Sequence, residues 1–305
     1  MKRLLVFVLF PCILCTCLFS VRKDQGDLTI IDPTSGLRLT VINKDFPLLK
    51  ILLPGQSNSE RGIEVEFPEH VTGINEQTNT LEHLYLVSRG SLNKRTLPSW
   101  EIQGNMLMYE TELNGNVKMI AKVQLDSNGV RYSYKFINNS NNSYQKFQAV
   151  TCVQLYSELH DSLLERTYVH HSDGFDLLAS ETPERLTMPL QKWLPCRYLV
   201  SYTLPVSKTR VEKDEDSITR YHKSRKVDKP VIATLSNNKK WVAATYTSET
   251  GNLWTNPDRS CHHADPSVIL KPSETKTLRL TTFIYKGSLQ KVLEYVDKEG
   301  LRQDD

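Results

Sequence analysis

Segments in which apolar and polar side chains alternate recur along the whole chain. In residues 36–42 every second side chain is apolar, and residues 62–67 and 130–136 repeat this pattern. A period of two is typical of antiparallel strands with one buried and one exposed face. Asn-Gly dipeptides at positions 114–115 and 128–129 supply tight turns between such strands. The pattern therefore predicts an all-β chain of antiparallel strands.

A period of 3.6 residues occurs once, close to the C-terminus. Ser288 has the residue type of a helix N-cap, and an apolar stripe from Leu289 to Val296 follows it and ends before Gly300. We find no repeat of fixed period and no linker rich in proline or glycine. We therefore expect residues 21–305 to form a single large antiparallel β-sandwich of the supersandwich type, with a short C-terminal α-helix.

Residues 1–20 have the layout of a secretory signal peptide. Two basic residues precede an apolar run that ends at Phe19, which is too short to be a convincing membrane span. Cleavage after Cys17 or after Ser20 would leave a small residue at the cut. Residues 14–17 also resemble a bacterial lipobox, so lipidation of Cys17 stays open. We expect a secreted or periplasmic protein without a membrane span, with a membrane-tethered lipoprotein as the alternative.

Composition narrows the class of partner and of chemistry. The 305 residues include 38 basic and 35 acidic ones, with both signs interspersed. Nucleic-acid binding needs a basic face, so we do not expect it here. The chain has no Gly-x-Ser-x-Gly, phosphate-binding loop, dinucleotide fingerprint, His-Glu-x-x-His or paired Cys-x-x-Cys. Serine hydrolases, nucleotide enzymes and common zinc proteins are therefore disfavoured, and we expect no cofactor.

Three of the six cysteines lie beyond the leader, namely Cys152, Cys196 and Cys261. An odd number allows one disulfide and one free thiol, or three thiols. A core held together by disulfides is thereby excluded, and the pairing of these cysteines stays open.

The segment LWTNPDRSCHHADPSV carries the densest candidate chemistry. His262 or His263 has the residue type for acid–base catalysis, with Asp265 close by. Trp254 offers a flat ring on which a sugar can stack, and Asn256 can hydrogen-bond sugar hydroxyls. We predict a catalytic group of His262, His263 and Asp265 with Trp254 and Asn256 in substrate binding.

Metal binding is an alternative for this segment, because Cys261, the histidines and Asp265 are competent ligand types. Adjacent residues of an extended chain point to opposite faces, so His262 and His263 cannot reach one ion without a sharp turn. We therefore expect no metal, and stoichiometric zinc or calcium in the purified protein would refute this. A purely structural turn, with one histidine buried and the other solvated, is the third interpretation.

A second polar segment, TRYHKSR, begins at Thr219. On an extended chain Arg220 and His222 share one face, and Arg225 lies on the other. The guanidinium group binds carboxylates and sulfates through two parallel hydrogen bonds. We predict that Arg220, His222 and Arg225 bind an anionic substrate, with a solvated hairpin as the simpler alternative.

Two weaker signals remain. Glu64 and Glu66 lie about 6.6 Å apart on one strand face, a spacing found between the carboxylates of inverting glycosidases and on any strand with two outward acids. We expect Glu69 and His70, which follow, to reach the same rim. A second double histidine, at positions 170–171, is most simply a satisfied part of the core or rim.

Two passages resemble the galactose-mutarotase-like sandwich of sugar epimerases, some polysaccharide lyases and glycosidase domains. Residues 130–159 are similar to its strand, Asn-rich turn and strand. Residues 270–289 resemble its closing strand pair around a Pro-Gly-Glu turn, with Ser273 in place of glycine. The resemblance implies a large antiparallel sandwich with a sugar-facing cleft on its concave side. The whole chain also resembles secreted bacterial proteins.

The chain departs from that family at both catalytic positions. Residues 151–152 read Thr-Cys where the family has Asn-His, and residues 251–256 hold no glutamate where the family has its catalytic one. The resemblance therefore does not carry mutarotation over, and it implies that His262, His263 and Asp265 take the place of the lost groups.

Together these observations predict a secreted β-sandwich protein that binds or processes carbohydrate. The expected substrate is an anionic poly- or oligosaccharide, held in a concave cleft lined by histidine and arginine. Whether the protein is an enzyme stays open. The alternative is a non-catalytic module that presents a glycan- or protein-binding face.

Overall fold

The computed structural model describes most of the chain. The described residues are 20–24, 27–43, 46–86, 98–181, 196–201, 210–213, 219–250 and 252–303. Residues 1–19 of the expected leader, including Cys17, lie outside them. No helix among the described residues is long and apolar enough to span a membrane.

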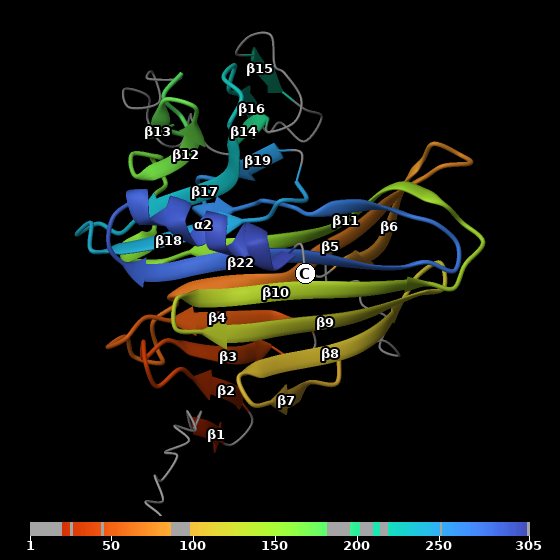
Figure 1. Ribbon diagram of the computed structural model, residues 1–305, viewed down its shortest axis with the longest axis horizontal. Helices are drawn as coiled ribbons and strands as arrows, with labels where there is room; N and C mark the ends of the chain where they lie inside the picture. Colours follow the sequence, from red (N-terminus) through yellow and green to blue (C-terminus); the bar gives the residue numbers. More distant parts are fainter. Residues whose placement is uncertain are drawn as a thin grey trace, which may run out of the picture.

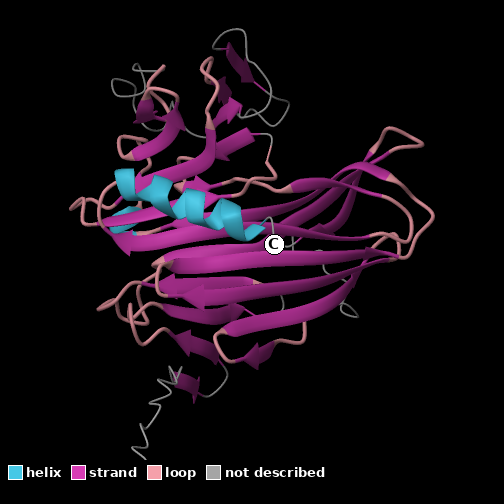
Figure 2. Cartoon of the chain, in the orientation of Figure 1, coloured by secondary structure: helices cyan, strands magenta, loops and turns pink. Residues whose placement is uncertain are grey.

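Two large antiparallel sheets and one small sheet make up the structure (Figures 1 and 2). The first sheet runs in the order β1 (Ser20–Asp24), β2 (Asp27–Ile31), β3 (Arg38–Asn43), β4 (Leu48–Leu52), β5 (Ile63–Asn75), β11 (Tyr144–Leu155) and β20 (Cys261–His262). In addition β6 (Leu81–Leu86) pairs with β5, and β21 (Ser267–Leu270) pairs with β11.

The second large sheet is also antiparallel. Its order is β13 (Gly174–Leu177), β12 (Thr167–His171), β17 (Lys229–Leu235), β18 (Trp241–Tyr246), β22 (Thr275–Lys286), β10 (Gly129–Asn138), β9 (Val117–Asp126), β8 (Met106–Leu113) and β7 (Glu101–Gln103). The small third sheet holds β15 (Arg210–Lys213), β16 (Thr219–His222), β14 (Cys196–Ser201) and β19 (Asn252–Thr255). A short 3₁₀ turn, η2, spans Ser157–Leu159.

The main core lies between the two large sheets. Phe67 on β5 packs against Tyr134 on β10 with ring centroids 4.8 Å apart, and Tyr109 on β8 donates a hydrogen bond to the Phe67 carbonyl at 2.7 Å. In β10 every second side chain from Val130 to Phe136 is buried, as the alternation predicts. Burial of one such large apolar side chain contributes about 1.5–3 kcal/mol. The predicted all-β sandwich is therefore confirmed.

The predicted C-terminal helix is α2 (Gln290–Gln303), which lies across the outer side of the second sheet (Figure 1). The expected end before Gly300 is wrong, because the helix continues through that glycine. A glycine inside a helix lowers stability by about 1 kcal/mol relative to alanine. A contact made by the preceding residue, Glu299, opposes this loss. The buried carboxylate of Glu299 accepts a hydrogen bond from Arg131 Nε on β10 at 3.0 Å.

One pair of strands departs from the antiparallel pattern. In the third sheet β14 and β16 run parallel, while β19 pairs antiparallel with β14. The third sheet is connected to the first through β19, because Trp254 and His263 form an antiparallel bridge. This bridge brings the segment after Leu253 against the end of β20, where the candidate site lies.

Candidate functional site

Strand register gathers polar residues on one face of the first sheet. Glu66 on β5 lies opposite Cys152 on β11, and Glu64 lies opposite Gln154. On the other side of β11, Gln154 lies opposite Cys261. Residues that are directly opposite in an antiparallel pair point to the same side of the sheet. The residues between them are buried in the main core, so this polar row lies on the outer face.

Part-exposed side chains on this outer face, together with the buried Gln154, form what we call the polar face. Gln154 Nε2 donates to Glu66 Oε1 at 2.9 Å, and Tyr156 donates to Gln154 Oε1 at 2.6 Å. Arg259 Nη1 lies 3.7 Å from Glu66 Oε1, and about half of the Arg259 side chain is exposed. The polar face consists of Glu64, Glu66, Glu69, His70, Gln154, Tyr156 and Arg259.

The two neighbouring acids of the polar face have pKa values shifted in opposite directions. Burial, and then the charge of Glu69, raise the pKa of Glu66 above its usual value. Burial also acts to raise the pKa of Glu69, but the hydrogen bond from His70 and the charge of His263 outweigh it and lower that pKa. Glu66 is therefore the better proton donor of the two, and Glu69 the better acceptor.

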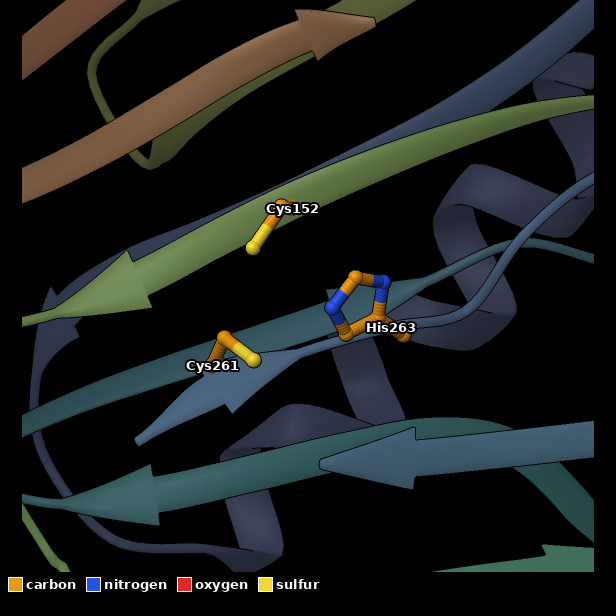
Figure 3. Close-up of side chains that lie close together, drawn as sticks. All are labelled: Cys152, Cys261 and His263. Carbon is orange, nitrogen blue, oxygen red and sulfur yellow. The ribbon is translucent and has the colours of Figure 1, made fainter. Parts of the chain in front are cut away.

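Next to the polar face lies a fully buried group that we call the Cys–His cluster. It consists of Cys152 from β11, Cys261 from β20 and His263, which directly follows β20 (Figure 3). The two sulfur atoms and one imidazole nitrogen all lie within 4.8 Å of one another. Both cysteines are free thiols.

Two further side chains fix the ring of His263. The indole of Trp254 stacks on it with ring centroids 3.5 Å apart. Trp254 Nε1 donates to Asp265 Oδ2 at 2.7 Å, and Asp265 Oδ1 lies 3.5 Å from His263 Nδ1. Since Nδ1 faces Asp265, the nitrogen that Figure 3 shows turned toward the two sulfurs is Nε2.

Charges within the cluster shift the pKa values strongly. Burial alone would raise the pKa of Cys261, but the hydrogen bond from Cys152 and the charge of His263 lower it to about 5. Burial would lower the pKa of His263, whereas Cys261 and Asp265 raise it to about 10. Between these values Cys261 is a thiolate and His263 an imidazolium. The same proximity, together with burial, raises the pKa of Cys152 well above its usual value.

His262 points to the opposite side of the sheet from His263. Its Nε2 lies 2.8 Å from the Thr234 hydroxyl and its Nδ1 3.2 Å from the Thr245 hydroxyl, and the ring is fully buried. Burial, and then the charge of His263, lower the pKa of His262 to about 3, so the ring is neutral. The sequence alone does not distinguish the roles of the two histidines, but in the structure their surroundings differ.

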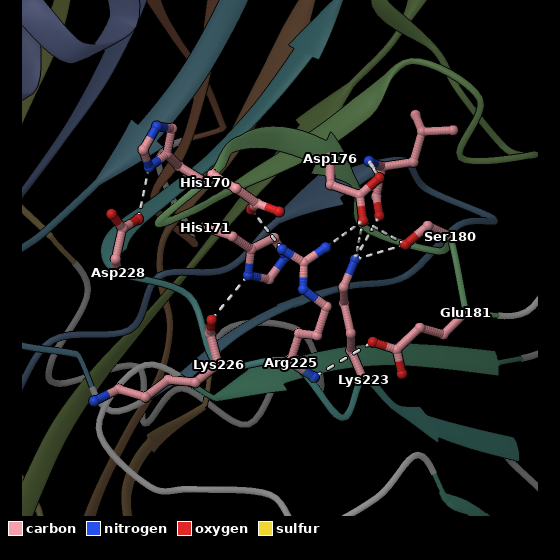
Figure 4. A network of polar contacts seen from close by, with 11 residues as sticks. His170, His171, Asp176, Ser180, Glu181, Lys223, Arg225, Lys226 and Asp228 are labelled. Carbon is pink, nitrogen blue, oxygen red and sulfur yellow. Dashed lines mark hydrogen bonds and ion pairs between the residues drawn. The ribbon is translucent and has the colours of Figure 1, made fainter.

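The other predicted site residues divide between two places. Asn256 is buried beside the cluster, and its backbone N–H donates to Cys261 Sγ at 3.4 Å. Arg225 instead forms ion pairs with Asp173 at 2.5 Å and Asp176 at 3.5 Å, within the polar network around the second double histidine (Figure 4).

The remaining pair, Arg220 and His222, lies on β16, opposite Arg197 and Leu199 of β14. Their side chains lie outside the described residues. The structure therefore brings His263, Asp265, Trp254 and Asn256 together. Their catalytic and binding roles stay predictions.

Unpaired buried polar atoms concentrate around the site. Among the described residues the atoms near it that make no hydrogen bond are Glu66 Oε2, His70 Nδ1, Thr255 Oγ1, Asn256 Oδ1 and both ring nitrogens of His263. Each buried group left unpaired costs about 1–3 kcal/mol. Such a concentration is typical of a place that binds something polar.

Comparison with known proteins identifies the fold. No protein-family model and no curated protein matches the chain. A galactose mutarotase-like protein from Lactobacillus casei is similar in structure, with a TM-score of 0.50 at 9% identity over 85% of this chain and 100% of that one. The Slr1438 protein of Synechocystis sp. has a TM-score of 0.49 at 12% identity, covering 86% and 96% of the two chains.

A galactose mutarotase related enzyme from Lactobacillus acidophilus has a TM-score of 0.47 at 10% identity, covering 86% and 97% of the two chains. The Lactobacillus casei structure carries the conclusion about the fold. The chain has the galactose-mutarotase-like β-sandwich fold, as the resemblance implied.

Proposed function

We propose that the protein binds and processes a carbohydrate on the polar face. The main support is the meeting of Glu66, Glu69 and Arg259 on the part-exposed outer face of the first sheet, beside buried polar atoms without partners. Carboxylates, amides and guanidinium groups are the partners that sugar hydroxyls and acidic sugars require. The fold shared with galactose mutarotase-like proteins is consistent with this proposal.

In the enzymatic form of the proposal, the two acids transfer protons at the sugar. Glu66 is the proton donor, and Glu69, held by His70 at 3.4 Å, is the acceptor. Two carboxylates in different surroundings can take opposite roles at one pH. His263 and Asp265 lie behind this face, so in this proposal they support the site.

An anionic saccharide is the proposed ligand. Arg259 is about half exposed and lies beside Glu66, where it can pair with a uronate or sulfate of the ligand. Arg225 is already paired with two aspartates, which makes it a poorer anion site. The part of Arg220 and His222 in binding remains a proposal from the sequence.

A glycan array with neutral and anionic saccharides tests this proposal, using Arg259→Ala and Arg225→Ala as a matched pair. We expect binding of an acidic saccharide that Arg259→Ala abolishes and Arg225→Ala retains. Loss in Arg225→Ala alone would overturn the polar face as the site. If the protein binds saccharides on the array but converts none of them into a product, the enzymatic form is overturned and the non-catalytic module is favoured.

Export, with residues 21–305 as a single mature domain, is also a proposal. It rests on the layout of residues 1–20. Mass spectrometry of the mature N-terminus tests it, because cleavage after Ser20 and a lipid on Cys17 give different masses. A mature protein that keeps Met1 would refute export through this leader.

A further inference from the structure

We propose that the Cys–His cluster is a zinc site, with the sulfur atoms of Cys152 and Cys261 and Nε2 of His263 as ligands. Two thiolates and an imidazole are the ligand types that zinc favours in proteins. This inference does not depend on the proposed function, and it departs from the sequence-based expectation of no metal.

The positions of the three ligand atoms fit one ion. Bonds of about 2.3 Å to sulfur and about 2.0 Å to nitrogen place zinc ligand atoms about 3.5–3.8 Å apart. Here all three lie within 4.8 Å of one another, so side-chain movements of about 1 Å bring them into range. The ligands come from β11 and from the end of β20, which strand pairing holds together, so the backbone already positions them.

A second, independent observation points to a ligand at this place. The ring of His263 is fully buried, and neither of its nitrogens makes a hydrogen bond within the described part of the chain. Nδ1 lies 3.5 Å from Asp265, while Nε2 faces the sulfurs (Figure 3). A carboxylate on one nitrogen and a metal on the other is the common arrangement of zinc-bound histidines.

The shell around His263 is itself well fixed. Asp265 is buried and accepts a hydrogen bond from Trp254, whose ring stacks on the imidazole. A ligand that is oriented in this way loses little freedom on binding an ion. Three protein ligands leave a fourth position of a tetrahedral ion open, which is the pattern of zinc sites that bind water or substrate.

The experiment uses the full chain, purified under reducing, oxygen-free conditions, stripped with chelator and titrated with Zn²⁺ or Co²⁺. We expect one ion per chain by elemental analysis and a Co²⁺ spectrum with thiolate charge-transfer bands. Cys261→Ser and His263→Gln should lose stoichiometric binding. His171→Gln, which changes a buried histidine elsewhere, should bind as the unchanged protein does.

A measurement on the unchanged protein covers variants that fail to fold. Zinc should raise the melting temperature of the reduced protein, and X-ray absorption should find two sulfur ligands and one nitrogen ligand. Absence of uptake by the reduced protein would overturn the proposal. So would a Cys152–Cys261 disulfide that persists under these conditions, or a bound ion whose spectrum shows no sulfur ligand.

Discussion

Two pairs of adjacent histidines lie on strands of this protein or directly after one, and their surroundings differ. In the pair His170–His171, Nδ1 of the first ring contacts Asp228 at 2.6 Å, and Nδ1 of the second contacts the Lys226 carbonyl at 2.8 Å (Figure 4). In the other pair, His262 is held by two threonine hydroxyls, whereas His263 faces two thiols and an aspartate.

The difference shows that neighbouring strands, and not the double-histidine motif, decide what each imidazole can do. Both pairs follow the same alternation, so one ring of each pair points to each side of its strand. For His263 the adjacent strand β11 supplies Cys152, and β19 supplies Trp254. For His170 and His171 the partners are an exposed carboxylate and a backbone oxygen.

The largest effect is expected at the acids beside the Cys–His cluster. Glu66→Gln removes the proposed proton donor, so turnover of the saccharide found on the array should fall about 10²–10⁴-fold while binding is kept. Glu110→Gln, a change of an exposed glutamate that pairs with Lys118 on a strand of the second sheet, is the matched control. Equal rates in Glu66→Gln and the unchanged protein would remove Glu66 from the chemistry.

The carboxylates beside the two histidine pairs can be compared directly through zinc affinity. Asp265→Asn weakens the support of His263 Nδ1, and we expect the affinity for Zn²⁺ to fall about 10–100-fold. Asp228→Asn alters the equivalent partner of His170 and should leave the affinity unchanged. Competition with a chromophoric chelator measures both, and equal losses in the two variants would contradict the assignment.

Removing one histidine of each pair compares the stability that a buried ring contributes with the stability that an exposed contact contributes. His262→Ala removes the imidazole partner of two buried hydroxyls, Thr234 and Thr245, which keep only Thr167 and Thr282 as partners, and should lower the free energy of unfolding by about 1–3 kcal/mol. His170→Ala breaks a contact with the exposed Asp228, worth about 0–1 kcal/mol. Urea denaturation measures the free energy of unfolding of both variants. A larger decrease for His170→Ala than for His262→Ala would contradict this prediction.

The smallest effect is a pH dependence from His171. Burial lowers its pKa below the usual value of about 6.5, and the Lys226 carbonyl only partly opposes this. A lowered histidine pKa gives stability that is complete above about pH 6.5 and is lost as the pH falls toward the folded-state pKa. His171→Gln should flatten that part of the stability–pH curve, and an unchanged curve would refute the role.

The fold class was predictable because alternation is local. Residues 130–136 give one apolar and one polar face whatever their partners are, and the burial of β10 follows from this. The parallel pairing of β14 with β16 was not predictable, because nothing within either strand specifies its neighbour. The local preference predicts that α2 ends before Gly300, but the contact of Glu299 with Arg131 outweighs it and the helix continues.

The candidate site was predictable only in part. Cys261 and His263 are two residues apart on an extended segment, so strand geometry puts them on one face, a relation that our sequence-based predictions did not use. Cys152 joins them through the pairing of β11 with β20, which a single sequence does not reveal. The sequence draws attention to Glu66 only through its spacing from Glu64, whereas in the structure its relevant neighbours are Glu69 and Arg259.

Whether the polar face binds an acidic saccharide is decided by a crystal structure of the protein with a saccharide selected on the array. We expect the sugar to lie on the polar face, with its acidic group at Arg259 and a ring hydroxyl or ring oxygen within hydrogen-bond distance of Glu66 or Glu69. A saccharide bound against Arg225 or under α2, with the polar face unoccupied, would contradict it.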